Sequence, residues 1–330
     1  MQAGQSSCRP LSIVAAVTMG CLFLAGSASA QDAGRAALPA MELMRDRAPA
    51  ANVKLPDHAK AGTAATGTFS VRALREGRIR LSLPDGRSIE ARLQRISEDK
   101  GQGRLSWLGT VDDMQGSLLS LTQYRGVVTG FLTYGAETWE IMPGADGKHI
   151  LYQVDEQKLP DQSTPLVPDG EPGGGDLGDE ASGQNEPSSN AGGSGYVHDL
   201  LIVYTPATRT KYGQAQLESM VQNAVAAANQ AYLNSNIDIT LNLVGLQEIN
   251  YKESGDASTS VYDLRGTNDG KMDGVHKLRN DVGADIVTLL TQDTNYCGWA
   301  YIMSSESTGF ASWAFNAVVP KCFSNLSLPH

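Results

Sequence analysis

The sequence predicts two folded parts, a small antiparallel β domain followed by a larger α/β domain. Residues 67–152 alternate apolar and polar side chains with a period of two, and turn residues such as Pro84-Asp85-Gly86 interrupt the alternation. Residues 160–195 lack periodicity and are rich in Gly, Pro, Ser and acidic residues, which predicts a flexible linker. Beyond residue 196, apolar runs typical of strands alternate with amphipathic runs typical of helices, which predicts a parallel sheet covered by helices.

Residues 1–30 have the pattern of a signal peptide. Arg9 precedes the apolar run 11–25, and Ala28-Ser29-Ala30 forms a small-x-small cleavage site. A lipoprotein site at Gly20-Cys21 is the alternative, but its sequence context is poorer. The apolar run is short for a membrane span, and no second long apolar segment follows. The chain is therefore predicted to be secreted or periplasmic, with no membrane partner.

After the signal peptide, residues 31–160 form the β-rich part, of which 31–60 are predicted to be a poorly ordered arm. The linker covers 161–195, and the α/β part covers 196–330. A long flexible joint in an exported protein favours a propeptide junction, although a spacer between two permanent domains would have the same composition. The chain has 26 Lys and Arg against 36 Asp and Glu, a net charge of −10, which argues against nucleic acid as a partner.

The α/β part divides into predicted elements by its hydrophobic periodicity. Strands are expected at residues 200–204, 237–243 and 286–290, and the third of these is expected to be buried on both faces. Helices are expected at 217–232 and 269–282, with a polar loop at 253–266. Residues 301–304 and 312–319 can add further strands, the former at an edge of the sheet.

The cysteines predict a disulfide. Cys8 and Cys21 leave with the signal peptide, so Cys297 and Cys322 remain as an even pair in an oxidising compartment. A bond between them closes a loop of about 25 residues, worth roughly 3 kcal/mol on a chain-entropy estimate. The alternative, two zinc thiolates, has weak support because the spacing fits no zinc ribbon or finger and Cys-x-x-Cys does not occur.

Several segments between residues 197 and 330 occur in an order and spacing that are specific together, although no single segment is specific. These segments are Asp199-Leu200-Leu201-Ile202-Val203-Tyr204-Thr205-Pro206, Ala228-Asn229-Gln230-Ala231-Tyr232, Met272-Asp273-Gly274-Val275-His276, Gly283-Ala284-Asp285-Ile286-Val287, Cys297-Gly298-Trp299-Ala300-Tyr301, Phe310-Ala311-Ser312 and Cys322. Through them, residues 197–330 resemble the metzincin-type, reprolysin-like secreted zinc metalloendopeptidases, in particular the bacterial peptidyl-Asp metalloendopeptidases.

The resemblance implies a metzincin-like α/β catalytic domain, truncated, with a zinc cofactor in the complete family member. The family's zinc helix carries His-Glu-x-x-His-x-x-Gly-x-x-His, and His330 falls on its first histidine. The catalytic Glu and the other two ligands are absent from the sequence, so we expect this chain to hold no zinc and to be inactive, with no catalytic residue of its own. Pro329 departs from the family pattern, and His330 as an accidental terminal histidine is the alternative interpretation.

Two hypotheses for function follow. The first is a monomeric precursor of a zinc endopeptidase whose substrate is a peptide or protein, cleaved at Asp in the resembling family. The substrate would pair with a sheet edge formed by Tyr301, Ile302, Met303 and Ser304. The second is a non-catalytic exported binding or inhibitory protein that keeps the scaffold without the metal site.

The disulfide is directly testable. In the protein purified without reductant, we expect a thiol-alkylating reagent to leave Cys297 and Cys322 unmodified, even after denaturation. After reduction, the same reagent should label both residues, as read by peptide mass spectrometry. Labelling of either cysteine in the denatured, unreduced protein would contradict the pairing.

Overall fold

The computed structural model describes residues 39–112, 114–161, 195–293, 295–303 and 307–329. The predicted signal peptide, the linker over 162–194, Ser304 and His330 lie outside these residues, so the interpretations that concern them stay predictions. In the described part of the chain, no helix is long and apolar enough to cross a membrane.

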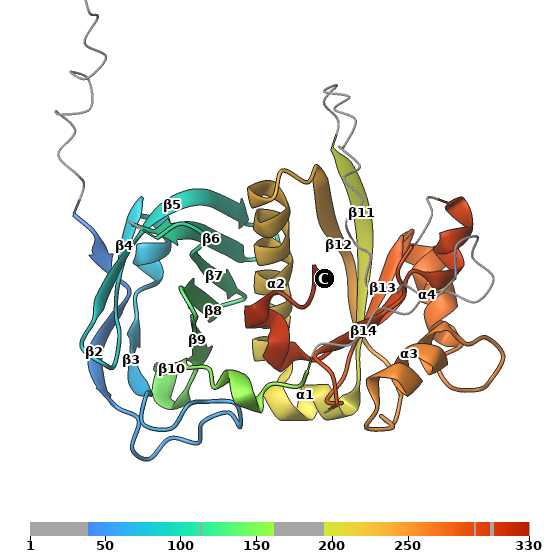
Figure 1. The fold of residues 1–330 in the computed structure, drawn as a ribbon, viewed down its shortest axis with the longest axis horizontal. Coiled ribbons are helices and arrows are strands. Elements are labelled where there is room, and N and C mark those ends of the chain that lie inside the picture. The colour runs from blue at the N-terminus through green and yellow to red at the C-terminus, as the bar shows by residue number, and fades with distance from the viewer. Residues whose placement is uncertain (1–38, 113, 162–194, 294, 304–306, 330) are drawn as a thin grey trace, which may run out of the picture. The chain divides into compact units, whose positions relative to one another are not determined.

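The β-rich part is one sheet of ten strands whose order is β1-β4-β5-β6-β7-β8-β9-β10-β3-β2 (Figure 1). Neighbouring strands are antiparallel except β1 and β4. The strands are β1 (Met41–Glu42), β2 (Met44–Pro49), β3 (Ala65–Phe69), β4 (Arg78–Ser82), β5 (Ser88–Asp99), β6 (Arg104–Val111), β7 (Leu118–Tyr124), β8 (Val127–Tyr134), β9 (Glu137–Pro143) and β10 (His149–Gln153), and the short helix η1 (Val71–Arg75) lies between β3 and β4.

Strands β1 and β2 close this sheet into a barrel. They are consecutive in the chain, yet they occupy its two ends, because Leu43 lies between them and bonds to both sides. The amide of Leu43 donates to the carbonyl of Arg80 at 2.8 Å, and its carbonyl accepts from the amide of Ser70 at 2.8 Å. Leu43 and Met44 are buried in the barrel core. The expectation of a poorly ordered arm was therefore wrong for 41–49, since two buried residues are too few to show a period.

Two tryptophans anchor the barrel interior. Trp107 and Trp139 are fully buried, and each indole N–H has an acceptor. Trp107 Nε1 donates to the carbonyl of Glu76 at 2.9 Å, and Trp139 Nε1 donates to the carboxylate of Glu137 at 3.0 Å. Both residues are therefore structural core aromatics.

The second part is a five-stranded sheet of order β12-β11-β13-β15-β14, in which the first four strands are parallel and β14 is antiparallel. Helix α2 covers one face, and α3 and α4 cover the other. The predicted mixed α/β architecture is confirmed. The elements are β11 (Tyr196–Tyr204), α1 (Pro206–Tyr212), α2 (Gln214–Asn234), β12 (Ile239–Glu248), α3 (Ala257–Arg265), α4 (Gly274–Val282), β13 (Ile286–Leu290), β14 (Gly298–Ala300), η4 (Thr308–Trp313), β15 (Phe315–Val318) and η5 (Pro320–Asn325).

The polar segment 253–266 is not the loop that was predicted, because it contains α3. Asp256 caps the helix, and its carboxylate accepts from the amide of Thr259 at 3.1 Å. The buried side chains of Ala257, Val261 and Leu264 follow helical spacing, but polar residues between them hide the short stripe. The next helix, α4, begins at Gly274, five residues later than expected.

Helix α2 also packs on the barrel. The hydroxyls of Ser120 and Thr122 on β7 donate to the side-chain oxygen of Asn223, at 2.7 Å and 3.1 Å. One turn earlier, the hydroxyls of Ser219 and Thr129 lie 2.9 Å apart. Ala227 packs with Leu108, Leu118 and Phe131 of the barrel. Figure 1 shows α2 with the barrel strands on one side and β11 and β12 on the other. This face of α2 is therefore buried, although most of its side chains are polar.

Asn223→Ala should destabilise the protein. The substitution removes a shared acceptor and leaves the hydroxyls of Ser120 and Thr122 without it in a buried interface. We expect the free energy of unfolding in urea to fall by about 1–3 kcal/mol. The control is Arg72→Ala, because the Arg72 side chain is 81% exposed, and its effect should stay within about 0.5 kcal/mol. Equal effects of the two substitutions would contradict a structural role for this contact.

Candidate functional site

Strand β14 is the candidate peptide-binding element because it lies at one end of the five-stranded sheet. It runs antiparallel to β15, with Trp299 opposite Ala317. At an outermost strand of this kind, an extended peptide can add as a further strand through main-chain hydrogen bonds. Strands β14 and β15 follow each other in the chain and are neighbours in the sheet, and they run in opposite directions.

The structure places this edge about three residues before the predicted range. Strand β14 ends at Ala300, Tyr301 forms a single bridge, and neither Ile302 nor Met303 belongs to a strand. Their side chains are exposed, and Ser304 lies outside the described residues. The position of the edge is thus corrected to Gly298–Ala300, because Cys297 and its neighbours are the residues held beside β15.

A cavity of about 270 Å³ lies beside β14. Residues of β13 and β15 line it, together with Tyr232 of α2, the last described residues, Ser327 to Pro329, and the aromatic side chains of Trp299, Tyr301 and Trp313. The hydroxyl of Tyr232 donates to the carbonyl of Pro329 at 3.2 Å, which fixes the end of the described chain against α2. The sheet, helix α2 and the C-terminal segment therefore enclose a mostly apolar hollow.

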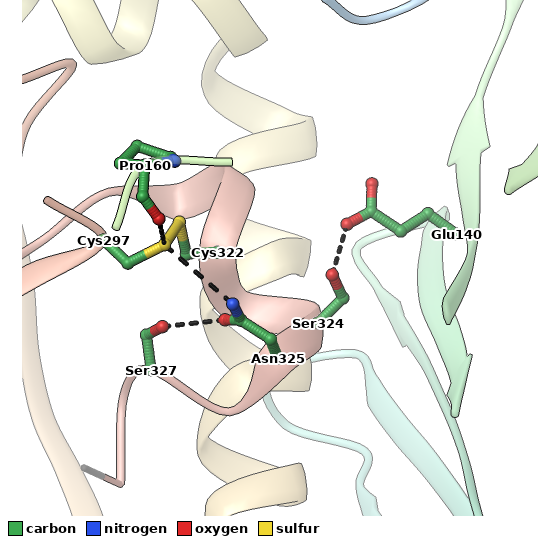
Figure 2. The surroundings of a disulfide bond; sticks show 7 residues. All are labelled: Glu140, Pro160, Cys297, Cys322, Ser324, Asn325 and Ser327. Atoms are coloured by element: carbon green, nitrogen blue, oxygen red, sulfur yellow. Dashed lines mark hydrogen bonds between the residues drawn. A yellow bond between two sulfur atoms is a disulfide. The ribbon is translucent and has the colours of Figure 1, made fainter. Parts of the chain in front are cut away.

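The predicted disulfide is present and joins the edge strand to η5. Cys297 directly precedes β14, Cys322 belongs to η5, and their Cα atoms are 5.6 Å apart. Figure 2 shows the bond and its surroundings. The Cys297 sulfur lies 3.3 Å from the carbonyl oxygen of Pro160, and the amide of Cys297 donates to the carbonyl of Asp161 at 2.9 Å. The chain that leaves the barrel therefore runs beside the start of the edge strand.

Glu140 of the barrel holds the other side of η5. Its carboxylate accepts from the hydroxyl of Ser324 at 2.7 Å, a contact visible in Figure 2. It also bonds to the ring Nε2 of His58 at 3.0 Å and to the hydroxyl of Tyr152. Each of these four side chains is almost completely buried. The only signal for this cluster in the sequence is a glutamate at a position of β9 where the neighbouring residues are apolar.

Burial and pairing oppose each other in this cluster, and pairing determines the direction of both pKa shifts. Burial by itself would lower the pKa of His58, but its hydrogen bond to Glu140 and the carboxylate charges outweigh burial and raise the pKa. Burial would raise the pKa of Glu140, but the hydrogen bonds and charge of its partners lower it. Where the barrel meets η5, pairing therefore favours the charged form of both the His58 imidazole and the Glu140 carboxyl.

The described residues do not contain a complete set of zinc ligands. Within them, no group of three or more His, Cys, Asp or Glu side chains could hold a metal ion. The two cysteines are bonded to each other, and His330, the predicted ligand, lies outside the described residues. The described donors therefore do not fit the cofactor that the resemblance implies.

Residues 218–322 match the family described as Metallo-peptidase family M12B Reprolysin-like. This region is reprolysin-like. The matched span runs from within α2 to Cys322, so it includes the strands β12, β13, β14 and β15 and the disulfide, whereas β11 precedes it. The resemblance inferred from scattered sequence segments is confirmed for these elements.

Two relatives are named peptidyl-Asp metalloendopeptidases. The protein from Xanthomonas campestris is 36% identical over 213 residues, which cover 63% of this chain and 49% of that protein. The protein from Stenotrophomonas maltophilia K279a is 34% identical over 238 residues, which cover 70% of this chain and 54% of that protein. The chain thus spans about half the length of the curated relatives it matches. A solved structure, metalloproteinase-II from Bacteroides fragilis, has a TM-score of 0.38 at 10% identity and covers 74% of this chain and 75% of that one.

The buried pair predicts how stability depends on pH. Because the pKa of His58 is raised in the folded protein, its contribution is complete below its unfolded value, near 6.5, and is lost as pH rises through the folded value. We expect native protein to exceed His58→Gln in the free energy of unfolding by about 1–3 kcal/mol at pH 6. This difference should shrink steadily toward pH 9.

His149 serves as the internal check on this measurement. Burial in the barrel lowers its pKa to about 4, so the stability of both proteins falls as the solution is acidified below pH 6.5. That loss is common to native protein and variant and cancels in their difference. A difference that stays constant from pH 6 to 9 would show that His58 is not held charged by Glu140.

Proposed function

We propose that this chain is part of an exported zinc metalloendopeptidase that cleaves peptide bonds beside aspartate. The observation that carries the proposal is the reprolysin-like match over 218–322, which falls on the sheet and its antiparallel edge strand. The two relatives named above supply the class of reaction and the aspartate preference. An extended peptide or protein segment would be the substrate, and it would add to the sheet along β14.

The barrel, in this proposal, is a propeptide that packs against α2 and η5 of the peptidase-like part. The 213 and 238 aligned residues of the two relatives exceed the whole of 196–330, so the similarity includes residues that precede the α/β part. The barrel contacts η5 through Glu140, and the residues that leave it, Pro160 and Asp161, contact Cys297 beside the edge strand. Latency would rest on another zinc ligand or on steric cover, because no cysteine between the signal peptide and Cys297 is available to ligate zinc.

Hydrolysis needs groups that the 330 residues do not contain. The sequence has no His-Glu-x-x-His, the pattern that places two zinc ligands and a general base on one helix face. The described donors offer no substitute. We therefore propose that the 330-residue chain contributes the scaffold and the peptide-binding edge and that it does not catalyse hydrolysis by itself.

Metal analysis and a proteolysis assay test this proposal together. The purified 330-residue chain, dialysed against micromolar zinc, should retain much less than one zinc ion per chain and should not degrade casein. A chain extended by a downstream segment with His-Glu-x-x-His should retain one zinc ion and degrade casein. Stoichiometric zinc with activity in the 330-residue chain would refute the assignment of roles.

The DNA beyond the codon for His330 separates this proposal from the alternative of a non-catalytic binding or inhibitory protein. If any reading frame close to that codon encodes His-Glu-x-x-His, the peptidase proposal is supported. If none does, the binding protein is favoured, and its expected property is saturable peptide binding without turnover.

A further inference from the structure

We propose that Arg265 selects an acidic side chain of a peptide bound along β14. This inference rests on the proposed function, to which it adds the residue that recognises the substrate. Arg265 is the last residue of α3, on the side of the sheet opposite to α2. No pattern in the sequence pointed to Arg265, because α3 lies in the segment that was expected to be a loop.

Aromatic rings hold the Arg265 side chain in place. Its guanidinium carbon lies 3.3 Å from the centre of the Trp313 ring and 5.7 Å from that of Tyr301. The rings of Tyr301 and Trp313 meet edge to face at 5.0 Å, and Tyr262 packs on Tyr301 at 6.4 Å. A guanidinium stacked on an aromatic face keeps its N–H groups in a fixed plane, so little freedom remains to be lost when a ligand binds.

Within the described residues, Arg265 uses only one of its side-chain nitrogens as a hydrogen-bond donor, whereas Arg279 uses all three. The Nε of Arg265 donates to the carbonyl of Ser312 at 3.1 Å, and within the described residues its two terminal nitrogens have no hydrogen-bond or carboxylate partner. All three nitrogens of Arg279 instead donate to backbone carbonyls, those of Ala284, Ala311 and Asp285. Arg279 therefore has a structural role, because its hydrogen bonds join residues 284–285 to Ala311. The two terminal nitrogens of Arg265 are available to a ligand.

The position of Arg265 suits a side chain of a peptide on β14. Tyr301 directly follows β14, so the ring that Arg265 approaches stands at the end of the edge strand. A peptide that adds to this edge sends alternate side chains to the two faces of the sheet. Those on the α3 face meet the aromatic rings and the guanidinium. A carboxylate matches an arginine fork with two parallel hydrogen bonds, and the partly buried surroundings strengthen them.

Equilibrium binding of two short peptides tests this inference. The peptides are acetyl-Ala-Ala-Asp-Ala-Ala-amide and its counterpart with Asn at the centre, titrated calorimetrically into the full chain. Native protein should bind the Asp peptide about tenfold more tightly than the Asn peptide. Arg265→Gln should bind both with the affinity that native protein has for the Asn peptide. The control is Arg72→Gln, which removes the same charge from an exposed site on the barrel and should keep the native ratio.

Arg265→Lys keeps the charge and loses the planar fork, so its preference for Asp should fall to about two- to threefold. This variant decides the question if Arg265→Gln fails to fold, which a thermal unfolding curve would reveal. Three results would overturn the inference: a native ratio of one, no measurable binding of either peptide, or an undiminished ratio in the Arg265 variants. Because neither zinc nor turnover enters this assay, its outcome is independent of the zinc and casein tests.

Discussion

Helix α2 is buried on two sides, against the five-stranded sheet and against the barrel, and the rest of the structure depends on these two contacts. One side presents Leu217, Val221 and Ala228 to the five-stranded sheet, which is the usual hydrophobic packing of a helix on a parallel sheet. The other side presents Ser219, Asn223 and Ala227 to the barrel. Small and hydroxyl-bearing residues allow the helix to lie close to the strands while every buried polar group named here finds a partner.

A second set of contacts ties the barrel to the edge of the peptidase-like sheet. The disulfide fixes β14 to η5, and η5 is held by Ser324 on the carboxylate of Glu140. A buried carboxylate is costly unless it is paired and hydrogen-bonded, and here His58, Tyr152 and Ser324 meet that requirement. Removal of the barrel would expose these polar groups together with apolar residues that share a cluster with it, such as Ala227 and Phe323.

The edge strand is where the two proposals meet. The cavity beside it is lined by Tyr301 and Trp313, the two rings that the guanidinium of Arg265 approaches. A peptide laid along β14 would thus meet apolar rings and a cationic group. Main-chain pairing alone would give affinity without sequence preference, so discrimination between substrates has to come from these side-chain sites.

The sequence by itself determined the order of the main strands, the course of α2, the disulfide and the reprolysin-like resemblance, because each depends on local periodicity or on residue identity. It located β13 at Ile286–Leu290, where an apolar run long enough for a buried strand leaves one interpretation. It missed α3, whose three buried apolar residues are too few to outweigh the polar residues between them. Only the tertiary structure decided that the polar face of α2 is an interface, that 41–49 close a barrel and that Glu140 and Arg265 stand where they do. In each case the partner lies many residues away, and no local pattern distinguishes a polar side chain that meets such a partner from one that meets water.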